Sequence, residues 1–293
     1  MWTILNSVFF MSLIDQSSFL CLILDVVSLM QQEISVEKAL GAVILYCNSF
    51  LLMHRHNRLV IMVVCGDEFR VIYPPVSHSN PNLNPVFHEL STIVETQLLS
   101  ITLVESERHK AQQTLPRYNY ISNAFSKSLT IINKQLRLAG TKFKSRIFIL
   151  QFDRDRIIDY NSLMNSIFSA QKLEVTVDAL IISKFESHIF QQACFLTGGL
   201  YLKHRDGSDM LQILNTYFLS DGQARQLFNQ PLQKTVDFKA SCFCHKSPVE
   251  YAYMCSVCLT LLCDELDRCP VCNSPSRRLL SQSNGSIMTN GHN

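Results

Sequence analysis

The sequence is poor in charge, and this excludes several classes of protein. Charged residues make up 17% of the 293 residues, the net charge is +2, and no run of five basic residues occurs. A surface that binds nucleic acid through charge alone is therefore not expected. The patterns GxxxxGK(S/T), GxGxxG and GxSxG are also absent, so nucleotide binding and hydrolase chemistry have no motif. We predict no catalytic activity, no small-molecule substrate and no direct binding to nucleic acid.

Basic residues are missing from the start of the chain, where none occurs before Lys38. Residues 1–17 are apolar, but they lack the basic start and the small-residue cleavage site of a secretory signal. Asn6, Asp15 and Gln16 interrupt them, whereas a transmembrane helix needs about 20 predominantly apolar residues. We therefore expect a leader of uncertain character at 1–17 and no membrane segment.

Apolar residues, in contrast, make up 47% of the chain. The length allows one domain of about 200 residues and a second, small one. Continuous apolar runs bounded by polar residues indicate strands that are buried on both faces. Such runs lie at 19–24, 59–65, 69–73, 146–152, 175–182 and 200–202. The third run alternates and follows the second after a tight turn, so we expect these two strands to be antiparallel.

Apolar residues at three- and four-residue spacing indicate helices between these runs. The stripes cover residues 36–51, 84–106, 121–136, 160–168, 189–196 and 210–217. This alternation predicts an α/β fold, a doubly wound, mostly parallel six-stranded sheet over residues 18–220. A linker at 221–240, a small zinc-binding module at 241–275 and a disordered tail at 276–293 complete the predicted organisation.

The cysteines cluster near the C-terminus, where seven of the eleven lie between 242 and 272. Two CxxC pairs, separated by ten residues, can close four thiolates around one tetrahedral Zn²⁺. We predict a structural zinc ion bound by Cys255, Cys258, Cys269 and Cys272. A disulfide knot would need an oxidising compartment. The remaining cysteines lie singly in apolar runs, which is typical of buried free thiols: Cys21, Cys47, Cys65 and Cys194.

Four further donors accompany these pairs, namely Cys242, Cys244, His245 and Cys263. Taken as pairs in chain order, all the donors interleave as in the cross-brace of a RING module. There the first and third pairs bind one metal ion, and the second and fourth pairs bind the other. A Cys242-x-Cys244 chelate would be cramped, and Cys263 has no donor close to it in the sequence. A second or alternative metal site at these four residues therefore stays open.

Two aspartates follow predicted strands at the edge where open α/β sheets bind ligands. With Asp25 after the first strand and Asp153 after the fourth, such a sheet resembles a von Willebrand factor A domain. In that family a D-x-S-x-S motif helps to hold Mg²⁺. Here Val27 and Leu29 replace the two serines, and a hard cation needs oxygen ligands. We expect no working site of this kind, and expect the aspartates to cap neighbouring helices.

Two stretches carry a wider resemblance. Residues 191–203, QQACFLTGGLYLK, lead into the last predicted strand. CFCH at 242–245 and YMCSVCL at 253–259 belong to the cysteine-rich region. Together they closely resemble the thirty-four-kilodalton core subunits of the general transcription and DNA-repair factor TFIIH. The resemblance covers roughly residues 19–272, and SAQK at 169–172 is also similar.

This resemblance implies a von Willebrand A-like domain joined to a C-terminal C4 zinc finger, whose ligands correspond to the four cysteines of the CxxC pairs. It implies a nuclear, non-catalytic scaffold of the TFIIH core. Its partners would be the forty-four-kilodalton subunit and other core subunits, including the helicases. Such a protein supports transcription initiation by RNA polymerase II and nucleotide excision repair. A RING-type ubiquitin ligase, or a zinc-dependent binding module outside TFIIH, is the alternative, and an isolated Cys263 argues against a ligase.

Two further expectations concern the larger domain. Asp178 lies inside a predicted strand, and we expect it to be satisfied by a hydrogen bond or to lie at a strand edge, and not to act in catalysis. The helices at 159–172 and 186–197 carry apolar residues off their main stripes, including Phe190 and Phe195. Because surplus exposed apolar area is typical of partner surfaces, we predict that these helices belong to an assembly platform.

Overall fold

The chain divides into two compact units, Met1–Val236 and Asp237–Asn293, which are described separately. The predicted leader at 1–17, apart from its last residue, and the predicted tail at 276–293 lie outside the described residues. The structure is a computed structural model that describes residues 17–25, 36–65, 68–74, 90–101, 120–139, 143–152, 160–205, 207, 209–220, 224–227, 231, 236, 238–245 and 248–275.

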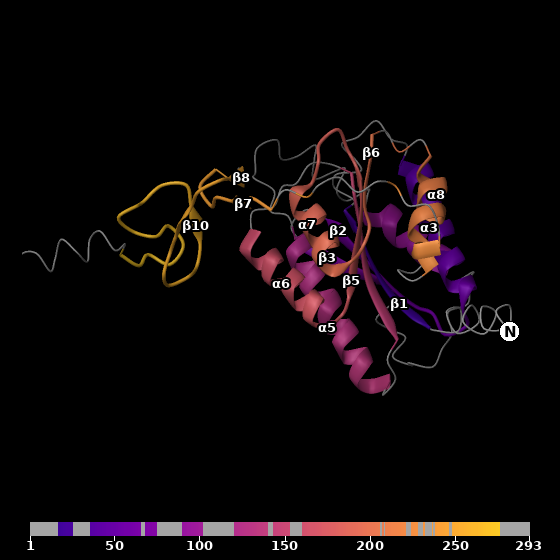
Figure 1. The fold of residues 1–293 in the computed structure, drawn as a ribbon. Helices are drawn as coiled ribbons and strands as arrows, with labels where there is room; N and C mark the ends of the chain where they lie inside the picture. Colours follow the sequence, from indigo (N-terminus) through magenta and orange to yellow (C-terminus); the bar gives the residue numbers. More distant parts are fainter. Residues whose placement is uncertain are drawn as a thin grey trace, which may run out of the picture. The chain divides into compact units, whose positions relative to one another are not determined.

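A six-stranded sheet forms the centre of the first unit, in the order β3-β2-β1-β4-β5-β6 (Figure 1). All neighbouring strands are parallel except β2 and β3, which are antiparallel. This is the doubly wound, mostly parallel six-stranded sheet that the sequence predicts. The strands are β1 (Ser18–Asp25), β2 (Arg58–Cys65), β3 (Glu68–Tyr73), β4 (Lys144–Gln151), β5 (Thr176–Ile182) and β6 (Tyr201–His204).

The central strands are buried on both faces, which explains why their sequences are continuous apolar runs. In β1, β4 and β5 every residue after the first is buried. Successive side chains of a strand point to opposite faces. In β1, accordingly, Leu20, Leu22 and Leu24 belong to one hydrophobic cluster, while Cys21 and Ile23 belong to the other. Each face of the sheet therefore needs its own cover of helices.

The helices supply these two covers (Figure 1). One face carries α3 (Val36–Met53), α8 (Met210–Ile213) and the helix Leu90–Ile101, whose side chains join the first cluster. The other face carries α5 (Ile121–Ala139), α6 (Tyr160–Lys172) and α7 (His188–Thr197). A π-helical turn, Leu214–Phe218, continues α8. The helical stripes read from the sequence thus correspond to the faces that pack on the sheet.

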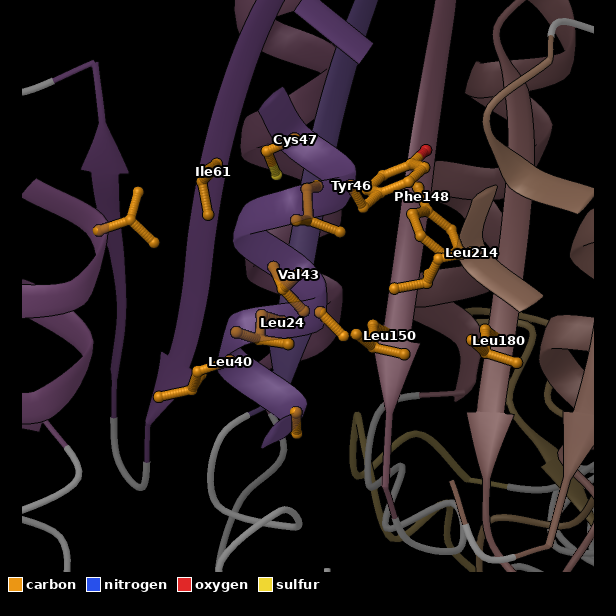
Figure 2. Close-up of a cluster of buried hydrophobic side chains, with 14 of the residues drawn as sticks. Leu24, Leu40, Val43, Tyr46, Cys47, Ile61, Phe148, Leu150, Leu180 and Leu214 are labelled. Carbon is orange, nitrogen blue, oxygen red and sulfur yellow. The ribbon is translucent and has the colours of Figure 1, made fainter. Parts of the chain in front are cut away.

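Helix α3 shows how such a stripe is used. Figure 2 shows side chains of α3, including Val43 and Tyr46, against strand residues such as Phe148 and Leu150. Among the described residues, α3 is the helix whose length and composition would allow it to cross a membrane. Core helices of soluble proteins meet the same criterion, and the buried stripe of α3 accounts for its apolar character.

The GG pair after α7 explains part of the 191–203 motif. Gly198 ends the helix in the left-handed conformation, with φ 70°, which residues with a Cβ adopt at a cost. Gly199 approaches β5 so closely that an added Cβ would lie 1.9 Å from the carbonyl oxygen of Val177. The first glycine turns the chain, and the second allows it to enter β6 beside β5.

A buried carboxylate joins distant parts of this unit. Asp178 of β5 accepts two hydrogen bonds from the guanidinium of Arg225, from Nη1 to Oδ1 at 2.7 Å and from Nη2 to Oδ2 at 2.6 Å. Arg146 of β4 lies 3.4 Å from Oδ2, and the Leu200 N–H donates to Oδ1 at 2.8 Å. Burial by itself raises the pKa of Asp178, but Arg225, Arg146 and the Leu200 amide together hold it below its usual value. The expectation that hydrogen bonds satisfy Asp178 is confirmed.

The same cluster holds the segment that follows α8. Arg146 Nη1 donates to the carbonyl oxygens of Phe218 and Ser220, each at 2.8 Å. Arg225 itself lies in a short 3₁₀ helix, Ala224–Leu227, inside the predicted linker 221–240. That stretch therefore contributes a buried side chain to the first unit, although the sequence shows no periodicity there.

Replacing Asp178 tests how much this cluster stabilises the fold. Asp178→Asn should lower the free energy of unfolding by roughly 3–5 kcal/mol, because it leaves the buried charge of Arg225 without its counter-charge. Urea denaturation followed by circular dichroism at neutral pH measures this loss. Asp209→Asn, which changes an exposed carboxylate of the same unit, should cost less than about 0.5 kcal/mol.

The pH dependence gives a second readout of the same pair. Because the pKa of Asp178 is lower in the folded protein than its usual value, its stabilisation is present at neutral pH. That stabilisation disappears as the pH falls from about 3.9, the unfolded value, through the folded pKa. In Asp178→Asn, the free energy of unfolding should therefore depend less on pH below about 3.9. Equal stability of Asp178→Asn and Asp209→Asn would contradict the role assigned to this cluster. So would a free energy of unfolding that depends on acid pH in Asp178→Asn as it does in the unmodified chain.

Candidate metal centre

The cysteines of the first unit lie in its core. Cys21, Cys47 and Cys194 are buried free thiols, as the sequence predicts, and the side chain of Cys65 lies outside the described residues. Burial raises the pKa of all three thiols, that of Cys47 to about 12. They are therefore protonated at neutral pH and act as small apolar side chains. Thiol chemistry in the described chain is thus left to the second unit.

The second unit contains short antiparallel strand pairs and turns that carry cysteines. Strand β7 (Ala240–Ser241) pairs with β8 (Pro248–Val249), and β9 (Tyr253–Met254) pairs with β10 (Leu261–Leu262). The first CxxC turn lies between β9 and β10, and the second lies between Arg268 and Pro275, which form an isolated bridge. Each turn is closed at its base by backbone pairing, which presents its two thiols together.

The structure brings the four predicted ligands of the CxxC pairs into one cluster. The Sγ atoms of Cys255, Cys258, Cys269 and Cys272 all lie within 4.8 Å of one another. The Sγ atoms of Cys255 and Cys272 are 3.6 Å apart, as are those of Cys258 and Cys269. Each short contact joins one CxxC pair to the other. This cluster of four thiols is positioned to hold a metal ion.

The two turns have the same backbone hydrogen bonds. In the first, the Leu259 N–H donates to the carbonyl of Cys255 at 2.9 Å, and the Cys255 N–H donates to the carbonyl of Thr260 at 3.0 Å. In the second, the Asn273 N–H donates to the carbonyl of Cys269, and the Cys269 N–H donates to the carbonyl of Ser274, each at 2.9 Å. The residue after each pair is left-handed, with φ 60° at Leu259 and φ 58° at Asn273. The two halves of the site are thus repeated copies of one local structure.

Hydrogen bonds to the sulfur atoms of Cys255 and Cys272 favour the thiolate, the form of cysteine that binds metal. The backbone N–H of Cys258, the Ser274 hydroxyl and the N–H of Val257 together lower the pKa of Cys255 to about 5. The Ser274 hydroxyl and its N–H also lower the pKa of Cys272. Burial raises the pKa of Cys269 to about 11. At neutral pH the cluster therefore already contains thiolate, the species that coordinates metals.

The other four donors form a second group in part. Cys242, His245 and Cys263 each place one ligand atom within 4.8 Å of the others. His245 Nδ1 lies 3.2 Å from the Sγ of Cys263 and 3.9 Å from that of Cys242. The inference from the sequence that Cys263 is isolated is therefore wrong, because the fold brings it to residues about 20 positions earlier. The argument against a RING-type module that relied on this isolation no longer holds.

The predicted aspartate sites are only partly described. Asp25 is buried at the end of β1, whereas Val27, Leu29 and Asp153 lie outside the described residues. The expectations for a Mg²⁺ site and for helix capping by these aspartates therefore stay predictions. Among the described residues, the groups that could hold a metal ion are the two in the second unit.

The left-handed Leu259 offers a test of the turn geometry. A residue with a Cβ pays about 1–2 kcal/mol in this conformation, and Leu259 is 61% exposed, so its side chain contributes little packing. Leu259→Gly should therefore raise the apparent metal affinity several-fold, measured by competition with a chromogenic chelator. Asn273→Gly is the matched control, since asparagine tolerates this conformation. An equal or larger gain for Asn273→Gly would contradict the strain assigned to Leu259.

Comparison with known proteins places this fold and cluster in one family. The family model described as "Transcription factor Tfb4" matches residues 17–273, which include parts of both units. General transcription factor IIH subunit 3 of Dictyostelium discoideum is 31% identical over 261 residues, which are 82% of this chain and 68% of that protein. The factor IIH subunit TFB4 of Arabidopsis thaliana is 30% identical, with 89% of each protein covered.

A solved structure agrees with the fold of the first unit. The TFIIH p34 N-terminal domain superposes with a TM-score of 0.56 at 21% identity, covering 70% of this chain and 99% of that domain. The match of the family model extends beyond this domain and contains all the cysteines of both metal-ligand groups. The chain therefore belongs to the Transcription factor Tfb4 family, whose named members are TFIIH subunits of transcription and DNA repair.

Proposed function

We propose that this chain is a non-catalytic scaffold subunit of the TFIIH core complex in the nucleus. In this role it supports transcription initiation by RNA polymerase II and nucleotide excision repair through contacts between proteins. The observation that carries the proposal is the family match, which runs through both units of the chain. A RING-type ligase, the alternative, is supported only by the order of the two donor groups along the chain.

The surroundings of the buried carboxylate and the buried thiols of the first unit support a structural role for this chain. In the described part of the chain, the buried carboxylate of Asp178 pairs with Arg225 instead of facing a cavity. The core thiols are protonated, as described above. A general base or nucleophile needs a pKa shifted toward neutrality and access to a substrate. The pKa values of Asp178 and of the core thiols are shifted away from neutrality, and we assign these groups to stability.

Exposed aromatic residues support a platform on the face covered by α6 and α7. Phe195 of α7 is 63% exposed, Phe168 of α6 is 45% exposed, and Phe185, just before α7, is 53% exposed. The exposure expected of Phe195 is confirmed, while its part in a platform stays a prediction. The prediction for Phe190 is wrong, since it is fully buried in the second hydrophobic cluster. We propose that this aromatic surface, Phe168, Phe185 and Phe195, binds the forty-four-kilodalton subunit.

A cavity next to Phe195 extends this surface. It has a volume of about 630 Å³ and lies beside β6, the edge strand of the sheet. Phe195, Tyr201 and Leu202 give it apolar walls, while Lys184, Lys203 and Glu186 add charge. Interfaces commonly combine an aromatic anchor with a polar rim. The cavity and the aromatic surface together resemble such an arrangement.

Charge substitution tests the platform. The double variant Phe168→Asp with Phe195→Asp should weaken binding of the forty-four-kilodalton subunit by at least about tenfold, because it places charge in an apolar contact. Pull-down and isothermal titration measure this change. The matched control is Leu52→Asp on α3, which is 69% exposed and belongs to the helix on the opposite face. Unchanged binding of the double variant, with an unchanged melting temperature, would contradict this assignment of the surface.

We also propose that the four-thiol cluster holds a structural Zn²⁺ through Cys255, Cys258, Cys269 and Cys272. Four sulfur ligands and no open position are the arrangement of structural zinc sites. Thiolate coordination contributes roughly 10 kcal/mol or more to the folding of a small module. The ion would therefore hold together a unit whose described residues form short strands and bury few apolar side chains.

Elemental analysis tests the metal and its role. Purified protein that has not met a chelator should contain at least about one zinc ion per chain. Cys255→Ser should lose this ion and unfold the second unit, seen as rapid proteolysis after residue 236, while the first unit keeps its melting transition. Val257→Ser, an exposed position in the same turn, should change neither. Less than half an equivalent of zinc in the unmodified chain would reject the assignment.

A further inference from the structure

The group Cys242, His245 and Cys263 has the local geometry of the four-thiol cluster. In each CxxC turn, the first cysteine accepts a hydrogen bond from the N–H three residues later, as Cys255 does from Cys258 and Cys269 from Cys272. The Sγ of Cys242 accepts the same bond from the N–H of His245 at 3.3 Å. His245, and not Cys244, therefore occupies the position of the second ligand. Cys242 and His245 thus form a C-x2-H turn with the local geometry of a CxxC pair.

The backbone places the third donor beside this turn. The N–H of Phe243 donates to the carbonyl of Leu261 in β10 at 2.8 Å. Cys263 follows β10 directly, so this bond fixes it next to the C-x2-H turn. Cys244 also has Cys263 as a hydrogen-bonding neighbour, and its side chain is exposed. The turn at 242–245 and Cys263 after β10 thus lie together, and between them they supply three sulfur donors and one imidazole.

The order of the donors along the chain adds an independent argument. The C-x2-H turn comes first, the first CxxC pair second, Cys263 third and the second CxxC pair fourth. The first and third contributions form one group, and the second and fourth form the other. In this interleaved arrangement each group closes a loop that contains part of the other. Few large apolar side chains among the described residues of this unit are buried, so its fold needs further cross-links.

We propose that Cys242, His245 through Nδ1, and Cys263 bind a second Zn²⁺, with Cys244 as the fourth ligand. Three thiolates and one imidazole are a donor set of structural zinc sites. The second ion would fix the entrance to the module, where the chain arrives from β7. This inference does not depend on assembly into TFIIH, so each can fail without the other.

The zinc content of the full-length chain tests this proposal. Protein purified without chelator should contain about two zinc ions per chain, whereas His245→Ala and Cys263→Ser should each contain about one. His188→Ala, which changes an exposed histidine of α7, is the matched control and should keep both. One ion in the unmodified chain, or two ions retained in both site variants, would overturn the proposal.

X-ray absorption of the unmodified protein covers the case in which the variants do not fold. With both sites filled, the average zinc environment should contain about 3.5 sulfur atoms and 0.5 nitrogen atoms, with the nitrogen at about 2.0–2.1 Å. A single four-sulfur site gives four sulfur atoms and no nitrogen. The mixed environment would support the second site, and the pure sulfur environment would overturn it.

Discussion

The apolar character of the central strands is the constraint on which the rest of the first unit depends. Because β1, β4 and β5 bury both of their faces, the sheet can exist only between two layers of helices. The chain must therefore cross from one face to the other as it winds. Helices α3 and α8 cover one face, and α5, α6 and α7 cover the other. The described surface that remains for partners is the outer side of these helices and the sheet edges.

Asp178 is a buried charge within this largely apolar sheet, and it shows what such a charge can do. Its two oxygens are occupied by Arg225, Arg146 and the Leu200 amide, so the charge is compensated at every described contact. Replacing such a cluster by apolar residues often costs little, whereas removing one member costs much. The cluster therefore specifies one position for the segment after α8 instead of simply adding stability.

The sequence predicts the elements whose signals are local. Apolar runs and stripes locate the strands and helices, and CxxC spacing locates the four-thiol cluster. It does not reveal contacts made by single residues far apart, since Arg225 lies 47 positions from Asp178 in an aperiodic stretch. The error at Phe190 has another cause. Helix α7 packs against both β5 and α6, so its buried face is wider than one stripe. For the second group, the useful signal was the C-x2-H spacing, which equals that of the CxxC pairs.

The distance in sequence between Asp178 and Arg225 also bears on how the protein is made. A ribosome adds residues in order, so β5 and its carboxylate emerge well before the arginine that neutralises it. Until the chain has passed residue 225, the nearly complete sheet holds a carboxylate whose main partner is missing, and closing around it is costly. Neutralisation of Asp178 therefore waits until the segment that carries Arg225 has been synthesised. A fragment that ends at residue 220 would keep all six strands of the large sheet and yet lack the arginine that neutralises Asp178.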